Sequence, residues 1–162
     1  MSSTESEPEP LCPPAEPVDA ADAAQGNPPV QPHWQTFMAL DYGLKRTGVA
    51  VGTRMLRSAS PRGTIAAEGK ARFAQVQRYL TEWQPDALVV GVPFHPDGAA
   101  HENTLRARKF IRQLRGRFGL PVLAVDERYS TTAAYAAGAT EANADAVSAC
   151  IILEQFFRSL EP

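Results

Sequence analysis

The sequence predicts an α/β domain built on a mixed five-stranded sheet, in which three antiparallel strands come first and alternating helices and strands follow, with helices on both faces. Two changes of pattern along the chain indicate this order. Residues 36–66 contain short apolar runs separated by polar connections, which is typical of strands joined by turns. From about residue 68, apolar residues recur every three or four positions and alternate with continuous apolar runs, which is typical of β-α-β units. No internal repeat is visible.

The first two strands are expected over residues 36–40 and 49–52, because both segments are short and apolar. The segment 41–48 between them carries two glycines and a polar centre, so it predicts the connection of a hairpin. A third, weaker strand is expected to include residues 63–66, after Pro61. Its mixed polarity and the neighbouring proline indicate an edge of the sheet.

Three amphipathic helices are expected, over about residues 68–83, 101–118 and 144–159, because apolar residues in each recur at steps of three and four. Gly119 and Pro121 mark the end of the second of these helices.

Two continuous apolar runs, residues 87–92 and 122–125, lie between the helices. A run without alternation is typical of a strand covered on both faces, so we expect both runs to be buried strands and the first of them to be central in the sheet. A further short helix, rich in alanine, is expected from Ser130, which suits an N-cap, to Gly138.

The composition, with 44% apolar and 21% charged residues, is that of an ordinary soluble protein. The sequence has neither an apolar stretch of membrane length nor a secretory signal, so we expect a protein that is neither exported nor bound in a membrane. Cys12 and Cys150 stand at opposite ends of the chain, which excludes a disulfide framework and a four-ligand zinc cluster built from them. These features predict a cytoplasmic protein.

Charge is unevenly distributed along the chain. Residues 1–33 contain six acidic residues, eight prolines and no Lys or Arg, so we expect a disordered tail that ends near His33. Taking these six from the total of 18 acidic residues leaves 12 acidic and 16 basic residues in the folded domain, residues 34–162, a formal charge of +4. The tail is either a solvating extension or a regulatory arm that mimics nucleic acid and competes for the basic surface.

Three carboxylates form the candidate site. Asp41 and Glu127 each follow a predicted buried strand, and Asp145 begins a helix on the same side as its apolar stripe. Buried carboxylates that face each other repel unless a cation lies between them. Oxygen ligands without His or Cys favour Mg²⁺ or Mn²⁺ over zinc, and His33, His95 and His101 show no metal-ligand spacing.

Each acid also has a purely structural interpretation. Asp41 could hydrogen-bond its own turn, Glu127 could pair with Arg128 or Lys45, and Asp145 could stabilise a helix N-terminus. Because all three are expected to converge, a shared metal site is the preferred hypothesis.

A metal site of this kind on a basic domain suits phosphodiester hydrolysis. Candidate ligands for nucleic-acid phosphates are Lys45 and Arg46 in the first connection and the basic residues of the predicted helix 101–118. A solvated helix face explains this second group about as well. Those helix residues are Arg106, Arg108, Lys109, Arg112, Arg115 and Arg117.

Four blocks of sequence resemble the YqgF/RuvX proteins in the same order. They begin with the segment ALDYGLKRTGVA at residues 39–50, continue with VVGVP at 89–93 followed by Asp97-Gly98, and then DERYST at 126–131. The last block is Ala144-Asp145-Ala146 before an apolar helix. The resemblance covers residues 37–157.

The resemblance implies an RNase H-like fold related to Holliday junction resolvases, and a cytoplasmic nuclease that matures the 5′ end of pre-16S ribosomal RNA. The family's acidic metal and catalytic positions would fall on Asp41, Glu127 and Asp145, with Arg128 among the residues that bind nucleic acid. Asp126 would point away from the site if the strand continues.

Three rival functions remain open at this point. The chain could cleave branched DNA, or it could be a binding module for ribosomal particles with little catalysis of its own. A third possibility follows from Asp41-x-Gly43, which resembles the phosphate loop of actin-like ATPases. Because those enzymes need two such domains and this chain supplies one, the ATPase interpretation is disfavoured.

Overall fold

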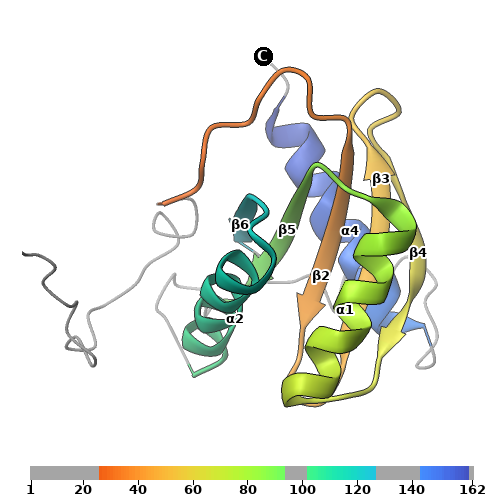
Figure 1. The fold of residues 1–162 in the computed structure, drawn as a ribbon. Helices are drawn as coiled ribbons and strands as arrows, with labels where there is room; N and C mark the ends of the chain where they lie inside the picture. The colour runs from red at the N-terminus through yellow and green to blue at the C-terminus, as the bar shows by residue number, and fades with distance from the viewer. Residues whose placement is uncertain (1–25, 94–101, 127–142, 161–162) are drawn as a thin grey trace, which may run out of the picture.

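One five-stranded sheet lies at the centre of the computed structural model, which describes residues 26–93, 102–126 and 143–160 (Figure 1). Its strands are β2 (Thr36–Tyr42), β3 (Thr47–Thr53), β4 (Ser58–Ile65), β5 (Ala87–Val92) and β6 (Val122–Asp126). They lie in the order β4-β3-β2-β5-β6. Strand β3 is antiparallel to both neighbours, whereas β2, β5 and β6 are parallel. The predicted mixed sheet is confirmed.

Helices cover both faces of the sheet, as predicted (Figure 1). On one face lie α1 (Gly69–Trp83) and α2 (Glu102–Phe118), and on the other lies α4 (Ala144–Ser159). Each helix agrees with its predicted bounds to within one residue. The short helix predicted from Ser130 to Gly138 lies outside the described residues.

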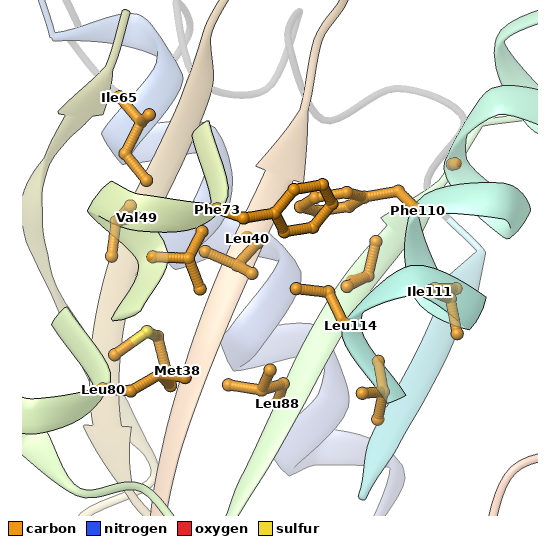
Figure 2. Packing of buried hydrophobic residues seen from close by; sticks show 14 of the residues in the cluster. Met38, Leu40, Val49, Ile65, Phe73, Leu80, Leu88, Phe110, Ile111 and Leu114 are labelled. Carbon is orange, nitrogen blue, oxygen red and sulfur yellow. The ribbon is translucent and has the colours of Figure 1, made fainter. Parts of the chain in front are cut away.

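The side chains of β2 alternate between two apolar cores. Met38 and Leu40 pack toward α1 and α2, whereas Phe37 and Ala39 pack toward α4. In the first core the rings of Phe73 from α1 and Phe110 from α2 lie against each other above the sheet (Figure 2). Because alternation continues along a strand, position 41 faces α4 and position 42 faces the opposite core.

The first hairpin is tighter than predicted. Pairing continues from Leu40 opposite Val49 to Tyr42 opposite Thr47, so the predicted eight-residue connection shortens to residues 43–46. The amide of Gly43 donates a hydrogen bond of 2.8 Å to the carbonyl of Arg46 and closes the turn. Asp41 is therefore part of a strand, and its side-chain direction is fixed by the ladder.

The third strand is present where predicted but is longer, since β4 includes residues 63–65 of the predicted 63–66 and begins at Ser58, before Pro61. Strand β4 is at the sheet edge, and the ladder steps from Val49 opposite Gly63 to Ala50 opposite Pro61, which leaves a bulge between them. An edge position and a bulge are the two settings in which a strand tolerates proline.

The ordered part of the chain also begins earlier than residue 34. The side chain of Asn27 donates to the carbonyl of Ala124 in β6 at 3.1 Å and accepts from the Ala124 amide at 2.8 Å. Val30 and Trp34 pack against the α4-side core. Residues 26–33 thus belong to the folded unit, while residues 1–25 lie outside the described residues and their disorder remains a prediction.

None of the helices in the described ranges is long and apolar enough to span a membrane. Cys150 is a free thiol buried in α4, and its burial raises the pKa to about 11. This cysteine therefore stays neutral and packs as a small apolar residue.

We predict that deleting residues 1–25 leaves the free energy of unfolding nearly unchanged, because this stretch, with five prolines and six acidic residues, has almost nothing large to bury. Deleting residues 1–34 should cost about 2–4 kcal/mol, since Trp34 packing and the Asn27 hydrogen bonds are lost. Urea denaturation of the two truncated chains measures both values. Equal stability of the two would contradict the boundary at Gly26.

Candidate active site

Two of the three predicted carboxylates lie near each other at one end of the sheet. Asp41 lies at the carboxyl end of β2 on the side of α4, and Asp145 lies in the first turn of α4. Burial and, as the smaller cause, the negative charge of Asp145 together raise the pKa of Asp41 to about 7. The pair is therefore a place where negative charge is crowded and poorly solvated.

A glycine allows the helix to come this close. Gly48 is the cross-strand partner of Asp41, and a Cβ built on it would overlap the backbone carbonyl of Asp145 and meet the amide of Ala146. Since those atoms belong to the backbone of a packed helix, they cannot move aside as a flexible side chain would. The missing side chain of Gly48 thus brings the first turn of α4 directly beside Asp41.

The opposite face of the same strand end is held by a buried arginine. Arg72 of α1 is only 4% exposed, and its guanidinium lies 4.6 Å from the centroid of the Tyr42 ring. It donates hydrogen bonds to the carbonyls of Leu44 at 2.6 Å and Ala67 at 3.0 Å. The Tyr42 ring also packs on Phe110 of α2, with centroids 4.8 Å apart. Arg72 therefore positions the turn that follows Asp41.

Arg46 forms an ion pair with the site. Its Nε lies 3.2 Å from Oδ2 of Asp145, and the two side chains are 58% and 27% exposed. A pair this open to water contributes little to stability. The ion pair acts locally, because it places a positive charge against one of the two carboxylates. Lys45, the neighbouring residue, is also exposed.

The third predicted carboxylate, Glu127, lies outside the described residues, as does Arg128. The alternation of β6 can be followed up to its end. Val125 packs on the α4 side and Ala124 on the other, which puts Asp126 on the face away from Asp41. This agrees with the expectation that Asp126 points away from the site.

The donor set suits a hard divalent cation, because Asp41 and Asp145 offer carboxylate oxygens only. Within the described ranges no group of three His, Cys, Asp or Glu side chains is close enough to hold a metal ion.

The basic residues of α2 have different surroundings. Arg106 pairs with Glu102 at 2.7 Å, and the guanidinium of Arg117 lies 4.3 Å from the Phe73 ring centroid. Arg115 donates 2.6 Å and 3.3 Å hydrogen bonds to the carbonyls of Val122 and Gly26. Burial lowers the pKa of Arg115, and the positive charge of Arg108 lowers it further.

Arg115 thus connects α2 to the edge strand β6, a structural contact that the sequence did not reveal. Arg112 is exposed and Arg108 is half-buried. The hydroxyl of Thr104 donates to the carbonyl of Pro93, which ties the start of α2 to the end of β5. Because the carboxyl ends of β5 and β2 lie at the same end of the sheet, the basic helix begins at the same end of the sheet as the acidic pair.

The architecture is that of the RNase H-like fold. It is similar to the structure described as T. thermophilus RuvC in complex with Holliday junction substrate, with a TM-score of 0.50 over 77% of this chain and 94% of that chain. The sequence identity is 18%, so this likeness concerns the fold alone.

The family follows from the sequence comparisons. A family model for RuvX, described as Holliday junction resolvase, matches residues 35–159, and this chain belongs to the RuvX family. A protein of Albidiferax ferrireducens named "Putative pre-16S rRNA nuclease" is 66% identical over 94% of this chain and 99% of its own length. A protein of the same name from Polaromonas sp. is 68% identical over 78% of this chain and 90% of its own. The predicted family is confirmed.

Sequence reasoning missed two residues that shape the site. Gly48 was interpreted only as part of a turn, although a glycine opposite a strand acid is a signal of close backbone approach. Arg72 lies one helical turn before Val76, at the edge of the apolar stripe of its helix, so its spacing was the signal of burial and its charge argued against it.

We predict that Gly48→Ala displaces the first turn of α4 and lowers the free energy of unfolding by about 1–3 kcal/mol. Gly116→Ala is the matched control, because Gly116 lies within α2 with open space around it, and there alanine should stabilise by about 0.5–1 kcal/mol. Chemical denaturation of both variants checks this. A Gly48→Ala protein as stable as the wild type would show that the helix is not held against this glycine.

A second prediction concerns pH. The Asp41 pKa is about 7 in the folded protein and 3.8 as the ordinary value, so without metal the wild type should lose stability as pH rises from about 4 through 7. Asp41→Asn cannot ionise and should escape this loss, becoming more stable than wild type by about 2–4 kcal/mol at pH 8. Denaturation in a chelating buffer across this range measures the difference. Parallel profiles for the two proteins would contradict the raised pKa.

Proposed function

We propose that this chain is a nuclease that hydrolyses phosphodiester bonds near the 5′ end of pre-16S ribosomal RNA in the cytoplasm, with Mg²⁺ or Mn²⁺ as cofactor. The substrate class is supported by the name that the highly similar relatives carry. The chemistry is supported above all by one observation, the proximity of Asp41 and Asp145 at the carboxyl end of β2.

Asp41, Asp145 and Glu127 are the proposed metal ligands and catalytic residues. A bound divalent ion supplies an activated water and stabilises the leaving oxygen of the cleaved bond. The high pKa of Asp41 means that this residue holds a proton in part of the molecules near neutral pH. Cation binding must release that proton, so we expect affinity for the metal to rise with pH around 7.

Arg46 has a double role in this proposal. In the metal-free protein its guanidinium partly neutralises Asp145. It sits on an exposed turn next to Lys45, where both side chains are placed to contact a phosphate close to the acidic pair. Arg108, Arg112 and Arg128 are proposed to extend this contact along the nucleic acid.

Branched DNA is the second candidate substrate, because the family model that matches this chain is described as Holliday junction resolvase. The two substrates share the phosphodiester chemistry and differ in backbone shape. A direct comparison of a pre-16S RNA fragment with a four-way DNA junction distinguishes them.

We predict that Asp41→Asn and Asp145→Asn lower metal-dependent cleavage of pre-16S RNA by on the order of 100-fold or more, because each removes a charge that holds the metal. Binding to the same RNA in chelating buffer should be unchanged or tighter, since a negative charge near the phosphates is gone. Gel assays of cleavage and binding at matched protein concentration measure both.

Glu82→Gln is the control, because it removes an exposed acid from the far half of α1 and should cleave as the wild type does. If folded wild-type protein binds ribosomal particles but cleaves neither substrate with Mg²⁺ or Mn²⁺, the nuclease proposal fails and a role as an assembly factor replaces it.

A further inference from the structure

The described chain begins beside the basic side of α2. The carbonyl of Gly26 accepts a hydrogen bond from Arg115, and the Asn27 side chain pairs with both backbone groups of Ala124 in the edge strand β6. The two Asn27 bonds imitate the pairing of a neighbouring strand. They fix the position of Gly26, to which residues 1–25 are joined.

Three arginines form a row that leads away from this place. Arg108, Arg112 and Arg115 follow each other at steps of four and three residues and therefore lie along one side of α2. At a rise of 1.5 Å per residue the row is about 10 Å long. The positive charge of Arg108 acts on Arg115, so the row concentrates positive charge along this side of α2. Below we call it the arginine row.

Residues 1–25 carry the opposite charge. They contain six acidic residues and no Lys or Arg. The three acids nearest to the exit point are Asp22, Asp19 and Glu16, at four, seven and ten residues before Gly26. An extended chain spans about 3.3–3.6 Å per residue, so these acids can reach roughly 13–35 Å from Gly26 and every arginine of the row lies within their range.

We propose that the acidic segment 1–25 docks on the arginine row and competes there with nucleic-acid phosphates. The competition rests on the proposed nuclease function, whereas the docking does not. Attachment at Gly26 holds the acids at a local concentration in the millimolar range, so weak pairs suffice. Because these contacts are exposed, they are screened by salt. A long precursor that presents many phosphates displaces the segment, whereas a short oligonucleotide does so poorly.

Docking is tested first without nucleic acid. The NMR signals of the arginine Nε–H groups are compared between the full chain and the chain lacking residues 1–25, at about 50 mM and about 500 mM salt. We expect the signals of Arg108 and Arg112 to differ at low salt and to coincide at high salt. Identical signals at low salt would overturn docking.

Two charge-matched variants test which acids dock. The triple change Glu16→Gln, Asp19→Asn and Asp22→Asn should give spectra close to those of the truncated chain. The triple change Glu5→Gln, Glu7→Gln and Glu9→Gln removes the same charge farther from Gly26 and should retain most of the difference. Equal effects of the two triples would overturn docking in favour of a diffuse field from the whole segment.

Competition is tested with a labelled pre-16S RNA fragment in chelating buffer. Removal of residues 1–25 should tighten binding by about 5–30-fold at about 50 mM salt, and the two curves should converge as salt rises. The double change Arg108→Gln and Arg112→Gln should abolish this difference, while Arg115 is kept because it holds Val122. Equal RNA affinity with and without residues 1–25 would overturn the competition. If the NMR signals show docking but the protein binds no RNA, the docking stands and the nuclease proposal is refuted.

Discussion

The close approach between the first turn of α4 and Gly48 is the constraint on which the site depends. The antiparallel ladder sets Gly48 opposite Asp41, so a helix that rests on this glycine must bring its own first turn beside the strand acid. No hydrogen bond between the two acids is needed for this. The register of one hairpin and the missing side chain of Gly48 bring the two carboxylates close together, although their negative charges repel each other.

That unfavourable pair persists because the elements that carry it are fixed elsewhere. Farther along α4, Phe156 and Phe157 pack on Phe37 of β2, with ring centroids 5.2 Å and 5.7 Å away. On the other face Arg72 and Phe110 hold Tyr42. Strand β2 is therefore held by α4 near its start and by α1 and α2 beside Asp41. Separating the acids would require the helix to leave an apolar core, which costs more than the repulsion between partly solvated charges.

The sequence predicted what depends on periodicity and missed what depends on pairing. Two-residue alternation and the spacing of α4 were enough to put Asp41 and Asp145 on facing surfaces. Periodicity says nothing about strand register. The predicted hairpin connection was therefore four residues too long, and the contact of Gly48 with α4 was not predicted. The Asn27 contact joins positions 97 residues apart in sequence. The composition of residues 1–33, from which disorder was predicted, does not indicate such a contact. Arg72 was missed because a cation on a helix normally reaches water.

Several of the cations counted as nucleic-acid ligands already have partners in the free protein. Arg46 lies against Asp145, Arg106 against Glu102, and Arg115 against two backbone carbonyls. In the proposed function, substrate and metal binding are then exchanges of partners. A cation between Asp41 and Asp145 would release Arg46 toward a phosphate, so metal and nucleic acid would favour each other's binding through this one side chain. Formal net charge cannot reveal this coupling, because it depends on which charges are paired before the ligand arrives.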